Sequence, residues 1–116
     1  MRKSFTYGGM NMIRELTDEA FQGFVENEAL AVVDFYATWC PPCDKLSPLL
    51  KEISDEYKDE LVVGAINVDT NPQTVQKYGV MSMPTVVVFQ QGEPISRLIG
   101  YRPKQTILNL LNLAAK

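Results

Sequence analysis

The sequence predicts an α/β domain whose central sheet carries helices on both faces. Two kinds of segment alternate along its 116 residues. Short runs rich in β-branched and aromatic residues are typical of buried strands, and amphipathic runs at helical spacing are typical of helices packed on a sheet. The length suits one compact domain, which can bury a core without a metal or a disulfide staple.

The N-terminal part of the chain is predicted to combine a leader with the first helix. Residues 1–11 show no periodic apolar pattern and are expected to form a flexible leader, so the folded domain should span residues 12–116. A weak strand is expected around Ile13. Thr17 then provides an N-cap, and apolar residues follow it at helical spacing: Phe21, Phe24 and Val25.

A buried strand leads from there to a long helix. Residues 29–36 form a nearly continuous apolar run broken only by Asp34, which is typical of a central strand buried on both faces. Further on, apolar residues recur on one helical face: Leu46, Leu49, Leu50, Ile53 and Tyr57. Pro48 lies inside this pattern and is expected to kink the helix.

The second half of the chain is predicted to add three strands and two helices. The strands are expected at residues 61–68, 85–89 and 94–99, and the helices from Asn71-Pro72 to about Gly79 and from Pro103 onward. A turn at Gln91-Gly92 separates the last two strands, so they are expected to pair as a hairpin.

Composition excludes several classes of function. The net charge of −3 offers no basic surface for nucleic acid. No segment approaches the ~20 apolar residues of a membrane helix. No apolar stretch follows Arg2 and Lys3, so a secretory signal is not expected. We therefore expect a cytoplasmic protein, monomeric, that binds neither nucleic acid nor membrane.

Two cysteines and the absence of histidine restrict the chemistry further. A structural zinc site takes four Cys or His ligands, and a c-type haem needs a His where this chain has Asp44. A redox pair, a metal site shared between two chains, or an inert bridge remains possible for Cys40 and Cys43. A bridge closing so short a loop stabilises little and is unusual in the cytosol, which favours redox chemistry.

The motif Cys40-Pro41-Pro42-Cys43 lies where the buried strand gives way to the helix. Cys40 is expected at the helix N-terminus, where unpaired N–H groups and the helix dipole favour an anion. Its pKa should therefore lie below the ~8.5 of free cysteine. Cys43 should be more buried, one turn further in, so that Cys40 attacks and Cys43 resolves. Pro41 and Pro42 fix φ and stiffen the turn.

A resemblance to the thioredoxin family becomes plain in residues 32–43, which run VVDFYATWCPPC. Further motifs match that family in order and spacing: Pro48, Asn67-Val68-Asp69, Lys77-Tyr78-Gly79-Val80, Met83-Pro84-Thr85, Gly92 and Gly100. The resemblance extends from about Thr17 to the C-terminus. It implies the thioredoxin fold, a central mixed β-sheet flanked by helices on both faces, and a protein-disulfide reductase that needs no bound cofactor.

The resemblance also implies roles for individual residues. Met83-Pro84 would be a cis-proline site facing the cysteines, where the Met83 backbone pairs with substrate; a simple loop breaker is the alternative. Trp39 would contact substrate, with core packing as its alternative. Asp34 would assist proton transfer to the resolving cysteine, or else cap local backbone. Beside the two prolines of the motif, a docking patch would include Met81, Ile99 and Gly100.

Two positions depart from the family pattern and bear on the thiol chemistry. Ala65 stands where thioredoxins commonly carry a Lys near the buried Asp, and Asp44 replaces the usual basic residue after the second Cys. The expected partners are protein disulfides and a thioredoxin reductase or an equivalent donor. The alternatives are an oxidant or isomerase, a membrane-tethered reductase, a binding module without turnover, and a metal carrier bridging two chains.

Overall fold

A five-stranded mixed sheet organises the protein, whose computed structural model describes residues 13–27 and 29–115. The strands are β1 (Ile13–Leu16), β2 (Leu30–Tyr36), β3 (Leu61–Asn67), β4 (Thr85–Gln90) and β5 (Glu93–Ile99). They lie in the order β1-β3-β2-β4-β5. The first three are mutually parallel, whereas β4 is antiparallel to both β2 and β5. The leader predicted at residues 1–11 lies outside the described residues.

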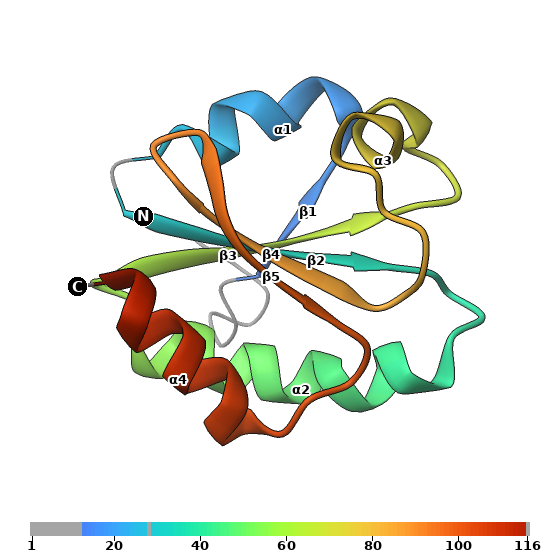
Figure 1. Cartoon of the computed structure of the whole chain (residues 1–116). Coiled ribbons are helices and arrows are strands. Elements are labelled where there is room, and N and C mark those ends of the chain that lie inside the picture. Colours follow the sequence, from blue (N-terminus) through green and yellow to red (C-terminus); the bar gives the residue numbers. More distant parts are fainter. Residues whose placement is uncertain (1–12, 28, 116) are drawn as a thin grey trace.

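Helices cover both faces of this sheet, as predicted. They are α1 (Asp18–Val25), α2 (Pro41–Glu56), α3 (Pro72–Tyr78) and α4 (Lys104–Ala115). Figure 1 shows α1 and α3 on one face and α2 and α4 on the other. Each face therefore has its own hydrophobic core. α2 runs as one continuous helix across Pro48.

Strand β2 supplies side chains to both cores because its residues alternate between the two faces. Every residue from Leu30 to Phe35 is buried. Ala31, Val33 and Phe35 enter the core beneath α1 and α3, whereas Leu30 and Val32 enter the core beside α2 and α4. By the same alternation, Asp34 faces α2. The structure thus confirms a central strand buried on both sides.

The N-termini of α1 and α3 cap each other across the sequence. Asn71 occupies the N-cap position of α3, but its side chain makes no bond to that helix. Its Oδ1 instead accepts a hydrogen bond from the backbone N–H of Asp18 at 2.9 Å. Asp18 in return accepts from the backbone N–H and the hydroxyl of Thr74. Asn71 thus precedes the proline at the start of α3, as the sequence indicates, while its side chain caps α1 instead of its own helix.

The C-terminal hairpin forms as predicted, with small differences at its bounds. β4 and β5 pair antiparallel around Gln91 and Gly92, which both have positive φ. β5 begins at Glu93 rather than at Pro94, and the register shifts at Val88/Phe89, next to the pairing of Phe89 with Pro94. Since β5 is an edge strand, a residue without an N–H is tolerated there.

Candidate active site

The two cysteines form a disulfide at the junction of β2 and α2, with Cα atoms 5.3 Å apart. Cys40 is the N-cap of α2, which confirms the predicted position at the helix start. Both residues are 4% exposed in this disulfide form. The expected difference in burial between them is therefore not seen in the disulfide form.

The helix start directs its first backbone donor at the sulfur of Cys40. Pro41 and Pro42 have no N–H, so the first N–H of α2 belongs to Cys43. That N–H donates to Cys40 Sγ at 3.2 Å. A hydrogen bond of this kind, together with the helix dipole, stabilises a thiolate at Cys40 once the disulfide is reduced. Asp44 adds a negative charge to the same first turn and opposes this effect.

A cis peptide bond between Met83 and Pro84 lies against the disulfide. Met83 packs on the small cluster formed by Ala37, Cys40 and Cys43. The structure thus brings the predicted cis-proline site and the cysteines together. Gly100 N–H donates to Pro84 O at 2.7 Å, which ties the end of β5 to the same loop.

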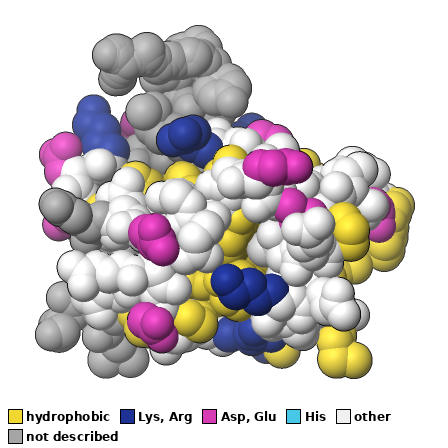
Figure 2. All heavy atoms as spheres, turned by 90° about the horizontal axis from the view of Figure 1, so that it is seen from above, with side chains coloured by type: hydrophobic (Ala, Val, Ile, Leu, Met, Phe, Trp, Pro, Cys, Tyr) yellow, Lys and Arg dark blue, Asp and Glu magenta, His cyan; other side chains and the backbone are white. Residues whose placement is uncertain are grey.

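Exposed apolar side chains lie on the segments around the disulfide. Trp39, next to Cys40, is 65% exposed, which excludes its alternative as a core residue. Its indole N–H donates to Asp69 Oδ2 at 2.9 Å. Met81 and Ile99 are also exposed. Figure 2 shows hydrophobic side chains at the right-hand end of the molecule, the end that carries the β2–α2 loop in Figure 1.

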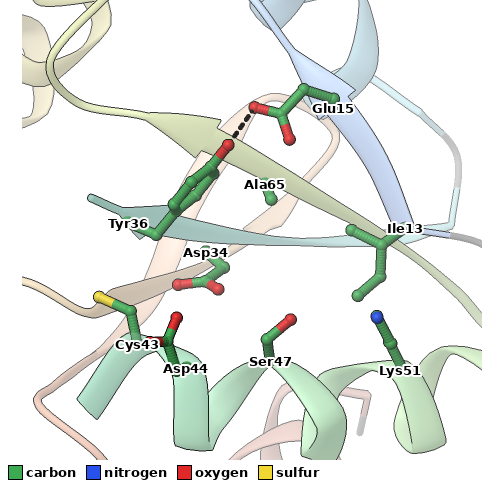
Figure 3. Close-up of a pocket in the computed structure, with 9 residues that line it drawn as sticks. All are labelled: Ile13, Glu15, Asp34, Tyr36, Cys43, Asp44, Ser47, Lys51 and Ala65. Atoms are coloured by element: carbon green, nitrogen blue, oxygen red, sulfur yellow. Dashed lines mark hydrogen bonds between the residues drawn. The ribbon is translucent and has the colours of Figure 1, made fainter. Parts of the chain in front are cut away.

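Asp34 is buried on the α2 side of the sheet, where it lines the same cavity as Cys43 (Figure 3). The residue is 4% exposed, and its Oδ1 has no hydrogen-bond partner among the described residues. The alternative for Asp34 is that it caps local backbone, but Oδ1 accepts no hydrogen bond from a described backbone N–H. Burial, and then the charge of Glu15, raises the pKa of Asp34 to about 7. The carboxyl is therefore poised to exchange a proton near neutral pH.

A row of three side chains across the sheet accounts for the effect of Glu15 on Asp34. In the register of the parallel strands, Ala65 on β3 pairs with Glu15 on one side and with Asp34 on the other. Side chains in such a row point to one face, and neighbouring strands are ~4.8 Å apart. The short side chain of Ala65 thus lies between Glu15 and Asp34 and fills little of the space between them, as Figure 3 shows.

Sequence reasoning missed the contribution of Glu15 and Tyr36 to this site. The Tyr36 hydroxyl donates to Glu15 Oε2 at 2.7 Å. Partial burial raises the pKa of Glu15 against the lowering effect of this bond. Burial, and then the bond to Glu15, raises the pKa of Tyr36. Tyr36 could have been suspected, because it lies two residues after Asp34 and so shares its face of β2.

The described residues show neither a metal centre nor a membrane segment. Among them, no group of three or more His, Cys, Asp or Glu side chains is placed to hold a metal ion. Within residues 13–27 and 29–115, no helix is long and apolar enough to cross a membrane.

Comparisons with known proteins agree on one family. The Thioredoxin family model matches residues 12–113. The chain is 41% identical over 92 residues to a thioredoxin of Alicyclobacillus acidocaldarius, covering 79% of this chain and 88% of that protein. It is 39% identical over 100 residues to a thioredoxin of Staphylococcus epidermidis, covering 86% of this chain and 95% of that protein. The solved structure of the Malassezia sympodialis thioredoxin Mala s 13 superposes with a TM-score of 0.83 at 27% identity, covering 91% and 93% of the two chains.

Proposed function

Because this chain belongs to the thioredoxin family, we propose that its Cys-Pro-Pro-Cys motif reduces disulfides presented by extended protein segments. The family membership makes the protein a thiol–disulfide oxidoreductase and a protein-disulfide reductase, with Cys40–Cys43 as the redox pair. What we propose beyond this is the role of each residue, the direction of electron flow and the partners.

The reaction begins with the reduced form of the pair. The Cys40 thiolate attacks one sulfur of a target disulfide, the target S–S bond breaks, and a mixed disulfide forms while the other target sulfur leaves as a thiolate. Cys43 then loses its proton and attacks Cys40 Sγ. This step releases the second target thiolate and leaves the Cys40–Cys43 disulfide, so that two electrons have passed to the target.

Asp34 is proposed to accept the proton that Cys43 loses in the second step. It lines the same cavity as Cys43, and its pKa of about 7 lets it take up or release a proton at neutral pH. A carboxyl group whose pKa lies near the working pH is basic enough to take up a proton and is still partly deprotonated, so it can accept one.

The surface around the disulfide is proposed to bind substrate without strict sequence preference. Trp39 and the two prolines that follow Cys40 are exposed beside the sulfur, and Met81 is 91% exposed. Methionine adapts to varied surfaces, which suits many targets. The backbone of Met83 would pair with an extended target segment, and Ile99 and Gly100 would border it.

We place this activity in the cytoplasm, with a thioredoxin reductase or an equivalent donor restoring the dithiol. A reducing compartment suits a protein that must return to its dithiol form after each turnover. Redox titration against glutathione checks the direction of electron flow. A reduction potential of the Cys40–Cys43 pair near that of disulfide reductants supports the proposal, and a potential typical of disulfide oxidants contradicts it.

The observation that carries the proposal is the hydrogen bond from the first N–H of α2 to Cys40 Sγ. It supports the proposal that Cys40 is the attacking sulfur and Cys43 the resolving one. Cys43→Ser should therefore trap target proteins as mixed disulfides through Cys40, whereas Cys40→Ser should trap none. Equal trapping by both variants would contradict the proposed roles of the two cysteines. Loss of insulin reduction in both, with activity in the parent, separates an enzyme from a binding module.

A further inference from the structure

A cavity of about 310 Å³ lies between α2 and the sheet where β1, β3 and β2 meet (Figure 3). Its size falls at the lower end of the range for small-molecule sites, ~300–1,000 Å³. Three of its lining residues are acidic: Glu15, Asp34 and Asp44. Lys51 is the one basic residue among the described lining, and Figure 3 places it at the Ile13 end, away from Asp34. The end that holds Asp34 is therefore acidic.

The cavity contains a buried acceptor that no neighbouring donor satisfies. Asp34 Oδ1 has no partner within the part of the chain that the structure describes, although a buried carboxylate without one is strongly unfavourable. Two of the nearby donors are engaged elsewhere, since the Tyr36 hydroxyl binds Glu15 and the Cys43 N–H binds Cys40 Sγ, and neither the Ser47 hydroxyl nor the Lys51 ammonium of the lining bonds to Asp34 Oδ1. The site is thus shaped to accept a donor that comes from outside the chain.

We propose that this cavity binds a small primary alkylammonium ion. The –NH₃⁺ group would lie over Ala65, between the carboxyl groups of Asp34 and Glu15. Its alkyl chain would extend toward Ile13, which is the apolar part of the lining.

The arrangement of acceptors favours an ammonium group over other cations. An –NH₃⁺ group carries three donors that point in different directions, and Asp34, Glu15 and the Ser47 hydroxyl line the cavity from three different elements. A guanidinium instead needs acceptors in the plane of its fork. The described acidic residues form no cluster fit for a metal ion, which disfavours a bare divalent cation.

The protonation state of Asp34 should control the affinity. The titratable groups that line the cavity with Asp34 are Glu15 on β1, Asp44 on α2 and Tyr36 on its own strand, with Lys51 of α2 at the far end of the cavity; of the described residues of β3, only Ala65 lines it. In the disulfide form Cys43 does not titrate. An alkylammonium stays charged to about pH 10, as lysine does. Binding should therefore strengthen as the pH rises through the Asp34 pKa of about 7.

The test is an NMR titration of the full-length oxidised chain with n-propylammonium chloride at constant ionic strength. Saturable shifts of the Asp34 and Ala65 amides are expected, with affinity about tenfold higher at pH 8.5 than at pH 5.5. N,N,N-Trimethylpropylammonium carries the same charge without N–H donors and should bind at least about tenfold more weakly. Using the oxidised chain keeps the result independent of the proposed disulfide reduction.

Three variants separate the site from its surroundings. Asp34→Asn should weaken binding at least about tenfold. Ala65→Met should block the cavity while keeping both carboxyl groups, so it tests the site even if the first variant alters the fold. Asp55→Asn removes a carboxylate from an exposed position of α2 outside the cavity and should bind as the parent does. Non-saturating shifts, equal binding of the quaternary ion, or parent-like binding by Ala65→Met would each overturn the proposal.

Discussion

Asp34→Asn is expected to stabilise the oxidised protein, and to do so increasingly as the pH rises. The parent side chain has a pKa of about 7 in the folded chain, against 3.8 for an Asp carboxyl in water. At a pH between these two pKa values, the folded chain therefore holds a proton on Asp34 that the unfolded chain has lost. Stability from this group is fully present below about pH 4 and is lost as the pH rises toward about 7. An Asn at this position undergoes no such loss.

The size of the effect follows from the burial of the carboxyl. Each tenfold change in a proton-dissociation constant is worth ~1.36 kcal/mol, so the difference between 3.8 and about 7 corresponds to ~4 kcal/mol at alkaline pH. Because Asp34 is 4% exposed, solvent screens little of this. Between about pH 4.5 and about pH 8, the variant should gain ~3 kcal/mol relative to the parent.

The assay is urea unfolding of parent and variant in the disulfide form, at several pH values across this window. The quantity compared is the difference between their free energies of unfolding, since other acids, Glu15 included, contribute to both proteins. A difference that stays constant within ~0.5 kcal/mol would refute the reasoning. Ala65→Lys provides a check, because an ammonium in the row beside Asp34 should lower the Asp34 pKa, as read by carboxylate NMR.

Three further predictions concern the fold. Gly64→Ala should cost ~1–3 kcal/mol in urea unfolding, because an added Cβ would lie 2.7 Å from Leu16 Cδ1 and 2.9 Å from Phe24 Cε2; an unchanged midpoint would contradict this packing. Asn71→Ala should lower the free energy of unfolding by ~1–2 kcal/mol, since it removes the acceptor for the first N–H of α1, and parent-like stability would mean that the cross-cap is not needed. Deleting residues 1–9 should leave the melting temperature and insulin reduction unchanged, as the leader hypothesis requires; a large drop in either would show that they contribute to the domain.

The sequence predicted best the features that depend on local patterns. The apolar run around Asp34 is short and continuous, so burial on both faces could be inferred without knowing its neighbours. The position of Cys40 at a helix start followed from the strand before it and the prolines after it. The equal burial of the two cysteines could not be foreseen, because it depends on whether the disulfide is closed.

The features that were missed depend on pairing between distant strands. Nothing near Glu15 in the sequence indicates that it shares a row with Asp34, because β1 has only four residues and a weak pattern. Asn71 also depends on a contact far away in the sequence. Its local sequence predicts a cap for its own helix, but its side chain caps α1 instead. Residue spacing gives the face of an element, but the register between strands decides which charges meet.

The row of Glu15, Ala65 and Asp34 links the stability prediction to the proposed ligand site. If an alkylammonium binds only the folded chain with ionised Asp34, it should oppose the loss of stability that the parent shows as the pH rises. At a ligand concentration 100 times its Kd, the expected gain is ~2.7 kcal/mol, which offsets most of the predicted loss of ~3 kcal/mol. Saturating n-propylammonium should therefore flatten the dependence of stability on pH in the parent, and at the same concentration it should stabilise Asp34→Asn, which binds at least about tenfold more weakly, by at least ~1.3 kcal/mol less. Equal stabilisation of both proteins would assign the effect to a general action of the salt rather than to this cavity.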